Sequence, residues 1–358
     1  MRSSLREIAF LFLKLGIIGF GGPAAHIALM EGEVVKRRRW LTRQEFLDLL
    51  GATNLIPGPN STEMAIHVGY RRAGFPGLIT AGVCFILPAA VIVTVVAWLY
   101  VRYGTLPEMD LVLRNVKPVI IVVVIQALWS LGHTAIKTSF LGAIAVGCAV
   151  LSFAGVHELV VLLLAAVCCP VVLKLKRTPM TLLSVGLLPL FLFFLKIGSV
   201  LFGSGYVLLA LLRADLVERW HWLTQAQLLD AVAVGQITPG PVFTTATFIG
   251  YVLAGLPGAF LATFGIFLPA FVFVAVSGSL APRIRSSRTA GAVLDGVNAG
   301  SLALMAVVFW QLARTAIVDI PTALIAIAAA VGLLVFKINS AWLVAGAAVL
   351  GALAAAVR

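Results

Sequence analysis

The chain has 358 residues, of which 61% are hydrophobic and only 11% are charged, and its mean hydropathy is +1.09. This composition excludes an ordinary soluble domain, which could not bury so much apolar surface, and predicts an all-α polytopic membrane protein. The net charge of +12 then indicates basic loops that orient the chain, and nucleic-acid binding is not expected. Because the four cysteines lie in apolar runs and the five histidines are scattered, no disulfide, metal site or cofactor is expected either.

The first half of the chain begins with a broken apolar segment and continues with two short helices. Residues 8–30 are apolar but are interrupted at Phe20-Gly21-Gly22-Pro23, and no signal-peptide cleavage site is expected. After a basic run at 36–39, Thr42 and Glu45 have the spacing of a capping box, which predicts a helix from there to about residue 55. A short helix to about residue 70 is expected next, and longer apolar segments follow at about 76–101, 113–133, 139–155 and 157–173.

Between the two short helices lies a Pro-Gly-Pro break, and the chain contains this break twice. Pro57-Gly58-Pro59 and Pro239-Gly240-Pro241 each stand within apolar sequence, and hydroxyl or amide residues follow closely. Proline is accommodated at the first position of a helix, and Asn, Ser and Thr are good capping residues. Each break therefore predicts a helix that begins inside the membrane, where free N–H groups and the positive end of the helix dipole form an anion site.

The second half of the chain repeats the first. Lys14 matches Lys196, an offset of 182 residues, and Trp40-Leu41-Thr42 and the first Pro-Gly-Pro break have counterparts at the same offset. One residue is then lost, and the match continues at an offset of 181, for example from Trp129 to Trp310. The chain is therefore an internal duplication, with an N-terminal transporter repeat at 1–177 and a C-terminal repeat at 178–358.

The two repeats are predicted to have inverted topology. Each contains about five spanning helices, and an odd number turns the second copy over if the two helices that flank each break return to their starting side. Loop charge agrees, because 281–291 is basic where its counterpart 102–112 is not, and Arg71-Arg72 is replaced by Val252-Leu253. Broken half-helices in corresponding places of inverted repeats are typical of a secondary transporter, with the substrate where the half-helices meet.

Several of these motifs together resemble the chromate ion transporter family. They are Phe20-Gly21-Gly22-Pro23-Ala24-Ala25-His26, Glu33-Val34-Val35, Arg38-Arg39-Trp40-Leu41-Thr42 and Pro57-Gly58-Pro59, with their copies in the second half. The resemblance covers nearly the whole chain and includes the duplicated, two-domain form. It implies a multi-pass protein of the cell inner membrane that exports chromate, confers chromate resistance and acts as a proton-coupled antiporter, with sulfate as a related substrate. The chain departs from the family pattern at Gly203-Ser204-Gly205-Tyr206, where Gly-Gly-Gly is common, and in the polar run 60–63.

The residues expected to bind the anion supply positive charge or hydrogen-bond donors. Lys14 and Lys196 would face a cavity or a charged partner at membrane depth, or would instead extend to the membrane edge. Glycines at the breaks would let backbone approach a ligand or would pack helices closely, and the amides would donate to the anion or to a neighbouring helix. The candidates are Lys14, Gly21, Gly22, Asn54, Gly58, Asn60, Ser61, Thr62, Lys196, Gly203, Ser204, Gln236, Gly240, Thr244 and Thr245.

Three residues of the first half, Glu63, His26 and His67, are candidates for proton coupling. Glu63 would carry a proton whose gain and loss alternate with anion binding, or would simply complement the dipole of the helix that it begins. The two histidines have side chains that titrate near neutral pH, although a lone histidine is more often only hydrogen-bonded within a helix bundle.

Four charged residues are candidates for a gate or for the mouth of the pathway. Glu33 and Asp215 match in the repeat and lie beside basic residues, so they form either a gate pair or loop salt bridges. Arg71 and Arg72 would attract anions at the cytoplasmic mouth, and an effect on chain orientation explains them equally well.

The sequence as a whole favours a secondary transporter of tetrahedral oxyanions that works by alternating access, with the two halves rocking against each other. The motif Gly-x-x-x-x-Gly-Lys-Ser/Thr does not occur, so ATP is not expected to drive transport directly. An oxyanion channel or uncoupled exchanger is the near alternative, and an intramembrane enzyme is a distant one, because no nucleophile–base pair or metal ligand set stands at membrane depth. The expected partners are a small inorganic oxyanion and the lipid bilayer, and the oligomeric state, including a homodimer, is left open.

Overall fold

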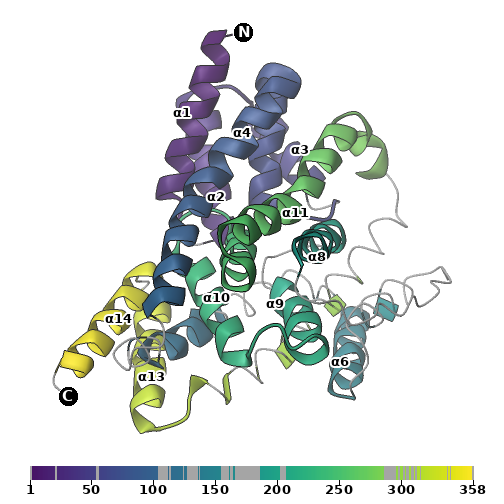
Figure 1. Cartoon of the computed structure of the whole chain (residues 1–358). Helices are drawn as coiled ribbons and strands as arrows, with labels where there is room; N and C mark the ends of the chain where they lie inside the picture. The colour runs from purple at the N-terminus through teal and green to yellow at the C-terminus, as the bar shows by residue number, and fades with distance from the viewer. Residues whose placement is uncertain are drawn as a thin grey trace. The chain divides into compact units, whose positions relative to one another are not determined.

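A computed structural model describes most of the chain. The described residues are 2–20, 22–53, 56–103, 112, 114–123, 125–126, 136, 138–154, 161, 164–165, 186–201, 207–285, 296, 299–300, 303, 306–307, 310, 313–314, 316–336, 338 and 340–356. Within these ranges all regular structure is helical, in agreement with the predicted all-α class (Figure 1).

Helices are interrupted at the places where the sequence predicts breaks. The first half contains α1 (Arg2–Ile18), α2 (Gly22–Glu31), the π-helical turn η1 (Gly32–Arg37), α3 (Arg43–Thr53), α4 (Asn60–Tyr103) and α6 (Ser139–Phe153). The second half contains α8 (Leu187–Val200), α9 (Val207–Leu212), the π-helical turn η2 (Arg213–Arg219), α10 (Gln225–Ile237), the 3-10 turn η3 (Val242–Thr244), α11 (Thr245–Arg285), α13 (Ile320–Leu334) and α14 (Ser340–Ala356).

The capping box predicted at Thr42 is present, and the second half has one like it. The backbone N–H of Thr42 donates to Oε2 of Glu45 over 2.8 Å, and the N–H of Glu45 donates to Oγ1 of Thr42 over 3.2 Å. Thr224 and Gln227 exchange the same two hydrogen bonds, over 2.9 and 3.1 Å. Since such a box satisfies N–H groups that a helix start leaves open, it explains why α3 and α10 begin where they do.

Each of the two long helices folds back sharply after its first few turns. The backbone of α4 leaves the helical region at Ala73 and Gly74, where Gly74 has a φ of +63°, and α11 makes the same turn at Gly255, with a φ of +62°. The two arms of α4 approach so closely that a Cβ on Gly69 would collide with the carbonyl oxygen of Gly77. Each long helix is thus a half-helix followed by a longer arm, as the predicted boundaries near residues 70 and 76 require.

Among the described residues, two helices are long and apolar enough to cross a membrane: α4 and the stretch Val242–Val276. Large apolar side chains are exposed at a spacing of four residues along the long arm of α4, which is the surface that a lipid-facing helix presents. These side chains are Phe75, Ile79, Val83, Leu87, Val91 and Val95. Shorter apolar helices are present elsewhere in the described residues, but much of 104–185 lies outside them, so about five crossings per repeat stays a prediction.

The chain divides into two compact units, and each unit contains segments of both halves. Unit 1 is Met1–Trp98, Val185–Gly205 and Val234–Ser287, and unit 2 is Leu99–Ser184, Tyr206–Ala233 and Arg288–Arg358. Both Pro-Gly-Pro breaks fall in unit 1, whose core includes Phe12, Phe46 and Phe85. The predicted boundary at 177/178 lies outside the described residues, and the two repeats stay a division of the sequence.

Local backbone geometry is the same in both halves, which supports the duplication. The turns η1 and η2 are π-helical pieces at equivalent positions. Each ends with the same hydrogen bond: the N–H of Arg38 donates to the carbonyl of Glu33 over 2.9 Å, and the N–H of Trp220 donates to the carbonyl of Asp215 over 2.9 Å. The offset between these pairs is the 182 residues found in the sequence. The inverted orientation of the two repeats stays a prediction.

Candidate functional site

Main-chain hydrogen bonds tie each Pro-Gly-Pro break to the other half of the chain. The N–H of Gly58 donates to the carbonyl of Leu201 over 2.7 Å, and the N–H of Gly240 donates to the carbonyl of Gly19 over 2.8 Å. Gly19 and Leu201 are equivalent residues, and each directly follows the end of a helix, α1 and α8 respectively. The two bonds are therefore reciprocal, because the break of either half donates to the first broken helix of the other.

Both breaks require glycine, by backbone shape and by packing. Gly58 has a φ of +140° and Gly240 has a φ of +89°, which residues with a side chain rarely adopt. A Cβ on Gly58 would lie 3.6 Å from the Cβ of Ala270, and a Cβ on Gly240 would lie 2.7 Å from the Cβ of Ala89. Since Ala89 and Ala270 are equivalent at the offset of 181, each break packs against the long helix of the other half.

Polar side chains at both helix starts are buried in the interior of unit 1. In the first turn of α4, Ser61 is 2% exposed and Thr62 and Glu63 are fully buried. After the second break, Thr244 is fully buried and Thr245 is 1% exposed. Burying a polar group costs free energy unless the group is hydrogen-bonded. A buried polar group without a partner therefore points to a functional site. The first turns after the two Pro-Gly-Pro breaks are therefore polar sites within the apolar interior of unit 1.

The hydroxyl groups of the second break are used within their own turn. Oγ1 of Thr244 donates to the carbonyl of Pro241, and Oγ1 of Thr245 donates to the carbonyl of Val242, both over 2.8 Å. The hydroxyl of Thr62 has no hydrogen-bond partner among the described residues. The backbone N–H groups of Thr62 and Glu63 donate to the carbonyl of Pro59, and that of Thr244 donates to the carbonyl of Pro241, so part of each first turn is already hydrogen-bonded to its own break.

Glu63 covers the first break from inside the unit. A Cβ on Gly58 would collide with Oε1 of Glu63, so the carboxyl group lies directly against the α-carbon of that glycine. His67 follows one turn later on the same face of α4 and is 1% exposed. Neither carboxyl oxygen of Glu63 nor Nε2 of His67 has a hydrogen-bond partner in the described part of the chain. This buried pair is the strongest candidate for a group that takes up a proton.

His26 supports the break between α1 and α2. Its Nε2 lies 2.9 Å from the carbonyl oxygen of Gly19, and because a carbonyl only accepts, this nitrogen carries the hydrogen. The imidazole ring also packs edge-on against Phe85, with 5.5 Å between ring centroids. The same carbonyl accepts the N–H of Gly240, so His26 lies directly beside the second break.

Lys14 and Glu33, predicted separately as a substrate residue and a gate residue, form an ion pair. Nζ of Lys14 lies 2.7 Å from Oε1 of Glu33, and Arg37 and Arg38 also contact this carboxylate, over 3.0 and 3.4 Å. The hydrogen bond from Lys14 lowers the pKa of Glu33 below its ordinary value, and Arg37 lowers it further, against the opposing effect of burial. Glu33 is therefore ionised at neutral pH and fixes the end of the Lys14 side chain.

The structure separates the remaining predicted site residues into several places. Gly22 begins α2 with a φ of +78°, Gln236 lies half-buried near the end of α10, and Asn60 and Lys196 are half-buried. Asp215 is 3% exposed and lies 3.7 Å from Arg219. Gly21, Asn54, Gly203 and Ser204 lie outside the described residues. Over the ranges given above, no group of three or more His, Cys, Asp or Glu could hold a metal ion.

The predicted mouth residues form part of a charged, aromatic surface of unit 1. Arg71 lies 3.3 Å from Glu45, and Arg72 lies 3.5 Å from Glu7. The guanidinium groups of Arg38 and Arg72 both lie near the ring of Trp40, at 5.2 and 5.1 Å from its centroid. Both predicted arginines are thus held by acidic partners, and Arg72 is also held by a cation–π contact.

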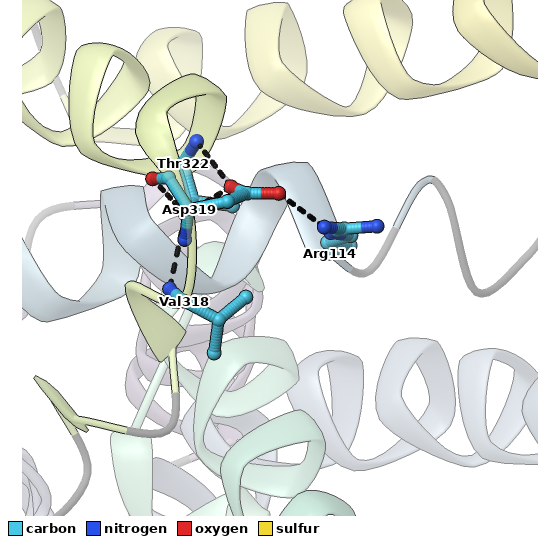
Figure 2. A network of polar contacts seen from close by, with 4 residues as sticks. All are labelled: Arg114, Val318, Asp319 and Thr322. Atoms are coloured by element: carbon cyan, nitrogen blue, oxygen red, sulfur yellow. Dashed lines mark hydrogen bonds and ion pairs between the residues drawn. The ribbon is translucent and has the colours of Figure 1, made fainter.

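Two ion pairs in unit 2 were not predicted from the sequence. Nζ of Lys117 lies 3.1 Å from Oδ1 of Asp230, whose other oxygen accepts a hydrogen bond from the hydroxyl of Tyr100 over 3.0 Å. Arg114, one turn before Lys117, pairs with Asp319 (Figure 2). A lysine within the apolar segment 113–133 is itself a signal of function at membrane depth, and it could have identified this group.

Comparison with known proteins identifies the family of the chain. The model of the chromate transporter family matches the chain twice, over residues 6–170 and 188–352. A chromate transport protein of Cupriavidus metallidurans is 33% identical over 380 residues, covering 98% of this chain and 93% of that protein. A probable chromate transport protein of Synechococcus elongatus is 30% identical, covering 91% and 89% of the two chains.

A third relative, a chromate transport protein of Pseudomonas aeruginosa, is 31% identical over 342 residues and covers 87% of this chain and 82% of its own. No solved structure matches the chain. The double match of the family model corresponds to the two halves seen in the sequence and in the repeated backbone geometry. The chain therefore belongs to the chromate transporter family and is a membrane transporter rather than an enzyme.

Proposed function

We propose that the protein is a multi-pass secondary transporter of the inner membrane that exports chromate by proton-coupled alternating access. The relatives named as chromate transport proteins support the substrate. Sulfate, which has the same tetrahedral shape and charge, is the related oxyanion that the same site would accept.

The burial of both helix starts in one compact unit carries the proposal. A tetrahedral dianion needs several donors and a positive potential, and a helix start supplies both through N–H groups and its dipole. The polar first turns at Ser61–Thr62 and Thr244–Thr245 are buried in unit 1. Irregular backbone at membrane depth is tolerated where it lines protein or a watery cavity, which fits a substrate site.

Proton coupling would depend on Glu63 and His67. A carboxylate buried without a partner is costly in an apolar interior, and protonation removes that cost. An oxyanion at the start of α4 would raise the cost of an ionised Glu63 through like-charge repulsion. Binding of the anion and binding of the proton at Glu63 would therefore favour each other. This coupling would carry both in the same direction, in place of the antiport that the family resemblance implies.

The reciprocal hydrogen bonds favour a mechanism in which a single moving body contains both breaks. They argue against a mechanism in which the two halves rock apart at the breaks. Rocking of the halves would have to break the bonds from Gly58 to Leu201 and from Gly240 to Gly19. Movement of unit 1 as a whole would leave them intact. This changes the mechanism expected from the sequence, although alternating access itself is kept.

Flux measurements in sealed liposomes test the proposal. Purified full-length protein is reconstituted, and chromate movement is followed with and without an imposed pH gradient, with empty liposomes as the control. Accumulation of chromate against its own gradient, driven only when pH differs, is the expected result. Chromate movement that is always downhill and independent of pH would replace the proposal with a channel or an uncoupled exchanger, and absence of any chromate or sulfate flux would overturn the substrate.

A further inference from the structure

A buried ion pair of unit 2 includes none of the residues of the two breaks, which belong to unit 1. The carboxylate of Asp230 is held between the ammonium group of Lys117 at 3.1 Å and the hydroxyl of Tyr100 at 3.0 Å. The side chains of Asp230 and Lys117 are only 4% and 16% exposed. Because a buried ion pair can often be replaced by apolar residues without loss of stability, its presence in a membrane protein points to a function.

A second, more exposed ion pair lies one helical turn earlier. Arg114 and Lys117 belong to the helical run 114–123 and are three residues apart, so their side chains leave the same face. Arg114 contacts Asp319 at the start of α13, and the two side chains are 45% and 31% exposed (Figure 2). The run 114–123 therefore carries an outer and an inner cation, each beside an aspartate from another element.

Both aspartates keep hydrogen-bond donors that do not depend on the cation. Oδ2 of Asp230 is bonded to the Tyr100 hydroxyl. Oδ1 of Asp319 accepts the backbone N–H of Thr322 over 3.0 Å and its hydroxyl over 2.6 Å, which caps α13 (Figure 2). If Arg114 or Lys117 turned to another anion, neither carboxylate would be left without a donor. This is the condition that an exchangeable ion pair must meet, since an orphaned buried charge is strongly destabilising.

The inner pair also joins elements that continue into the breaks. Tyr100 lies near the end of α4, the helix that starts at the first break. Asp230 lies in α10, which leads to the second break and ends at Ile237, roughly 10 Å further along the helix axis. The two residues that hold the inner pair, Tyr100 and Asp230, thus lie on the helices that adjoin the first and the second break in the chain.

We propose that Arg114 and Lys117 are two successive binding points for the transported oxyanion. A tetrahedral dianion such as chromate or sulfate would replace Asp319 as the partner of Arg114 and then replace Asp230 as the partner of Lys117. Arg and Lys donate charge-assisted hydrogen bonds to such oxygens, and the waiting aspartate prevents either cation from remaining bare between passages. This inference rests on the proposed function, because it names the residues along which the same substrate moves.

The test measures chromate flux against concentration in liposomes containing full-length protein and its variants. The double variant K117M/D230N removes both charges of the inner pair, and R114M removes the outer cation but leaves the cap of α13 in place. Each is expected to raise the KM for chromate about tenfold, the effect of one lost charge-assisted hydrogen bond. K117R, which keeps the charge, should retain most of the affinity, and D230N should lower KM and slow turnover because Lys117 holds the anion longer.

The control is R213M/E218Q, which removes another ion pair of unit 2, in which Nη2 of Arg213 lies 2.8 Å from Oε1 of Glu218. Its KM should equal that of the wild type. An unchanged KM in K117M/D230N with an unchanged melting temperature would show that the inner pair is only structural and would overturn the proposal. If K117M/D230N does not fold, the KM of R114M is the test instead, and an unchanged KM of R114M would also overturn the proposal. Absence of flux in the wild-type protein would instead refute the proposed function.

Discussion

The carboxyl group of Glu63 lies directly against the α-carbon of Gly58, where a Cβ would collide with its Oε1. Gly58 also has a φ of +140°, and its N–H is bonded to the carbonyl of Leu201. The first break is therefore held from three directions: by its own backbone conformation, by the other half of the chain, and by the acidic residue of the helix that it begins.

Replacing Gly58 or Gly240 with alanine should destabilise the folded protein by roughly 2 kcal/mol or more, because a side chain is strained at these φ values and would meet close neighbours. The measurement is the melting temperature of the purified variants in detergent. The control is G147A in α6, where a Cβ would meet nothing within 4 Å and the backbone is helical. A melting temperature of G58A equal to that of G147A would contradict the packing described at the break.

Replacing Glu63 with glutamine should abolish the response of chromate flux to a pH gradient while downhill flux persists. The amide has nearly the same shape as the carboxyl group but cannot lose or gain the proton, so only coupling is removed. Flux is measured in liposomes with and without a pH difference. E63T, which carries the threonine found at the equivalent position 245, is a second uncoupled variant. A pH response of wild-type size in both variants would exclude Glu63 as the proton carrier.

Replacing Glu33 with glutamine should destabilise the protein by on the order of 1 kcal/mol at neutral pH, because Lys14, Arg37 and Arg38 lose their shared partner. The pKa of Glu33 is lowered from its ordinary value of 4.5, chiefly by the hydrogen bond from Lys14, so its contribution is fully present above that value. The contribution is lost as pH falls through the lowered pKa. The difference in melting temperature between wild type and E33Q should therefore be constant from pH 6 to 8 and shrink only in acid.

E7Q is the control for this measurement, because Glu7 and Arg72 lie 3.5 Å apart and both are about half exposed. Its effect should stay within about 0.5 kcal/mol at every pH. An E33Q difference that disappears near pH 7 would mean that the carboxyl group of Glu33 is not the partner of Lys14.

Separate fragments 1–177 and 178–358 should fold and transport only when they are produced together. Each break lacks its carbonyl acceptor and its packing alanine when the other half is missing. Co-purification of a tagged fragment with its untagged partner, followed by flux measurement, tests this. If one fragment alone transports chromate and is as stable as the full chain, the hydrogen bonds between the two halves are not needed.

The sequence predicts the features that depend on neighbouring residues. The capping box at Thr42, both Pro-Gly-Pro breaks and the boundary between residues 70 and 76 follow from local sequence, and the structure confirms them. The duplication was also visible, because equivalent residues keep one offset over most of the chain.

Contacts between distant segments could not be derived in the same way. The sequence allowed a partner for Lys14 but did not identify it as Glu33, and Lys117 pairs with Asp230 across more than one hundred residues. Charge periodicity within one helix does not identify a partner on another, since packing decides which polar groups meet. For the same reason the sequence could not show that the two compact units each contain segments of both halves of the chain, and the repeats 1–177 and 178–358 stay a division of the sequence.

The exchange of hydrogen bonds between Gly58 and Leu201 and between Gly240 and Gly19 has the form of an isologous dimer interface enclosed in one polypeptide. In such an interface every donor of one copy meets the acceptor of the other, so neither copy is complete alone. Fusion of two copies keeps them at a fixed one-to-one ratio and lets their sequences diverge, as Glu63 and Thr245 have done. A carboxyl group can therefore stand at the start of one half-helix while its equivalent in the other half stays neutral.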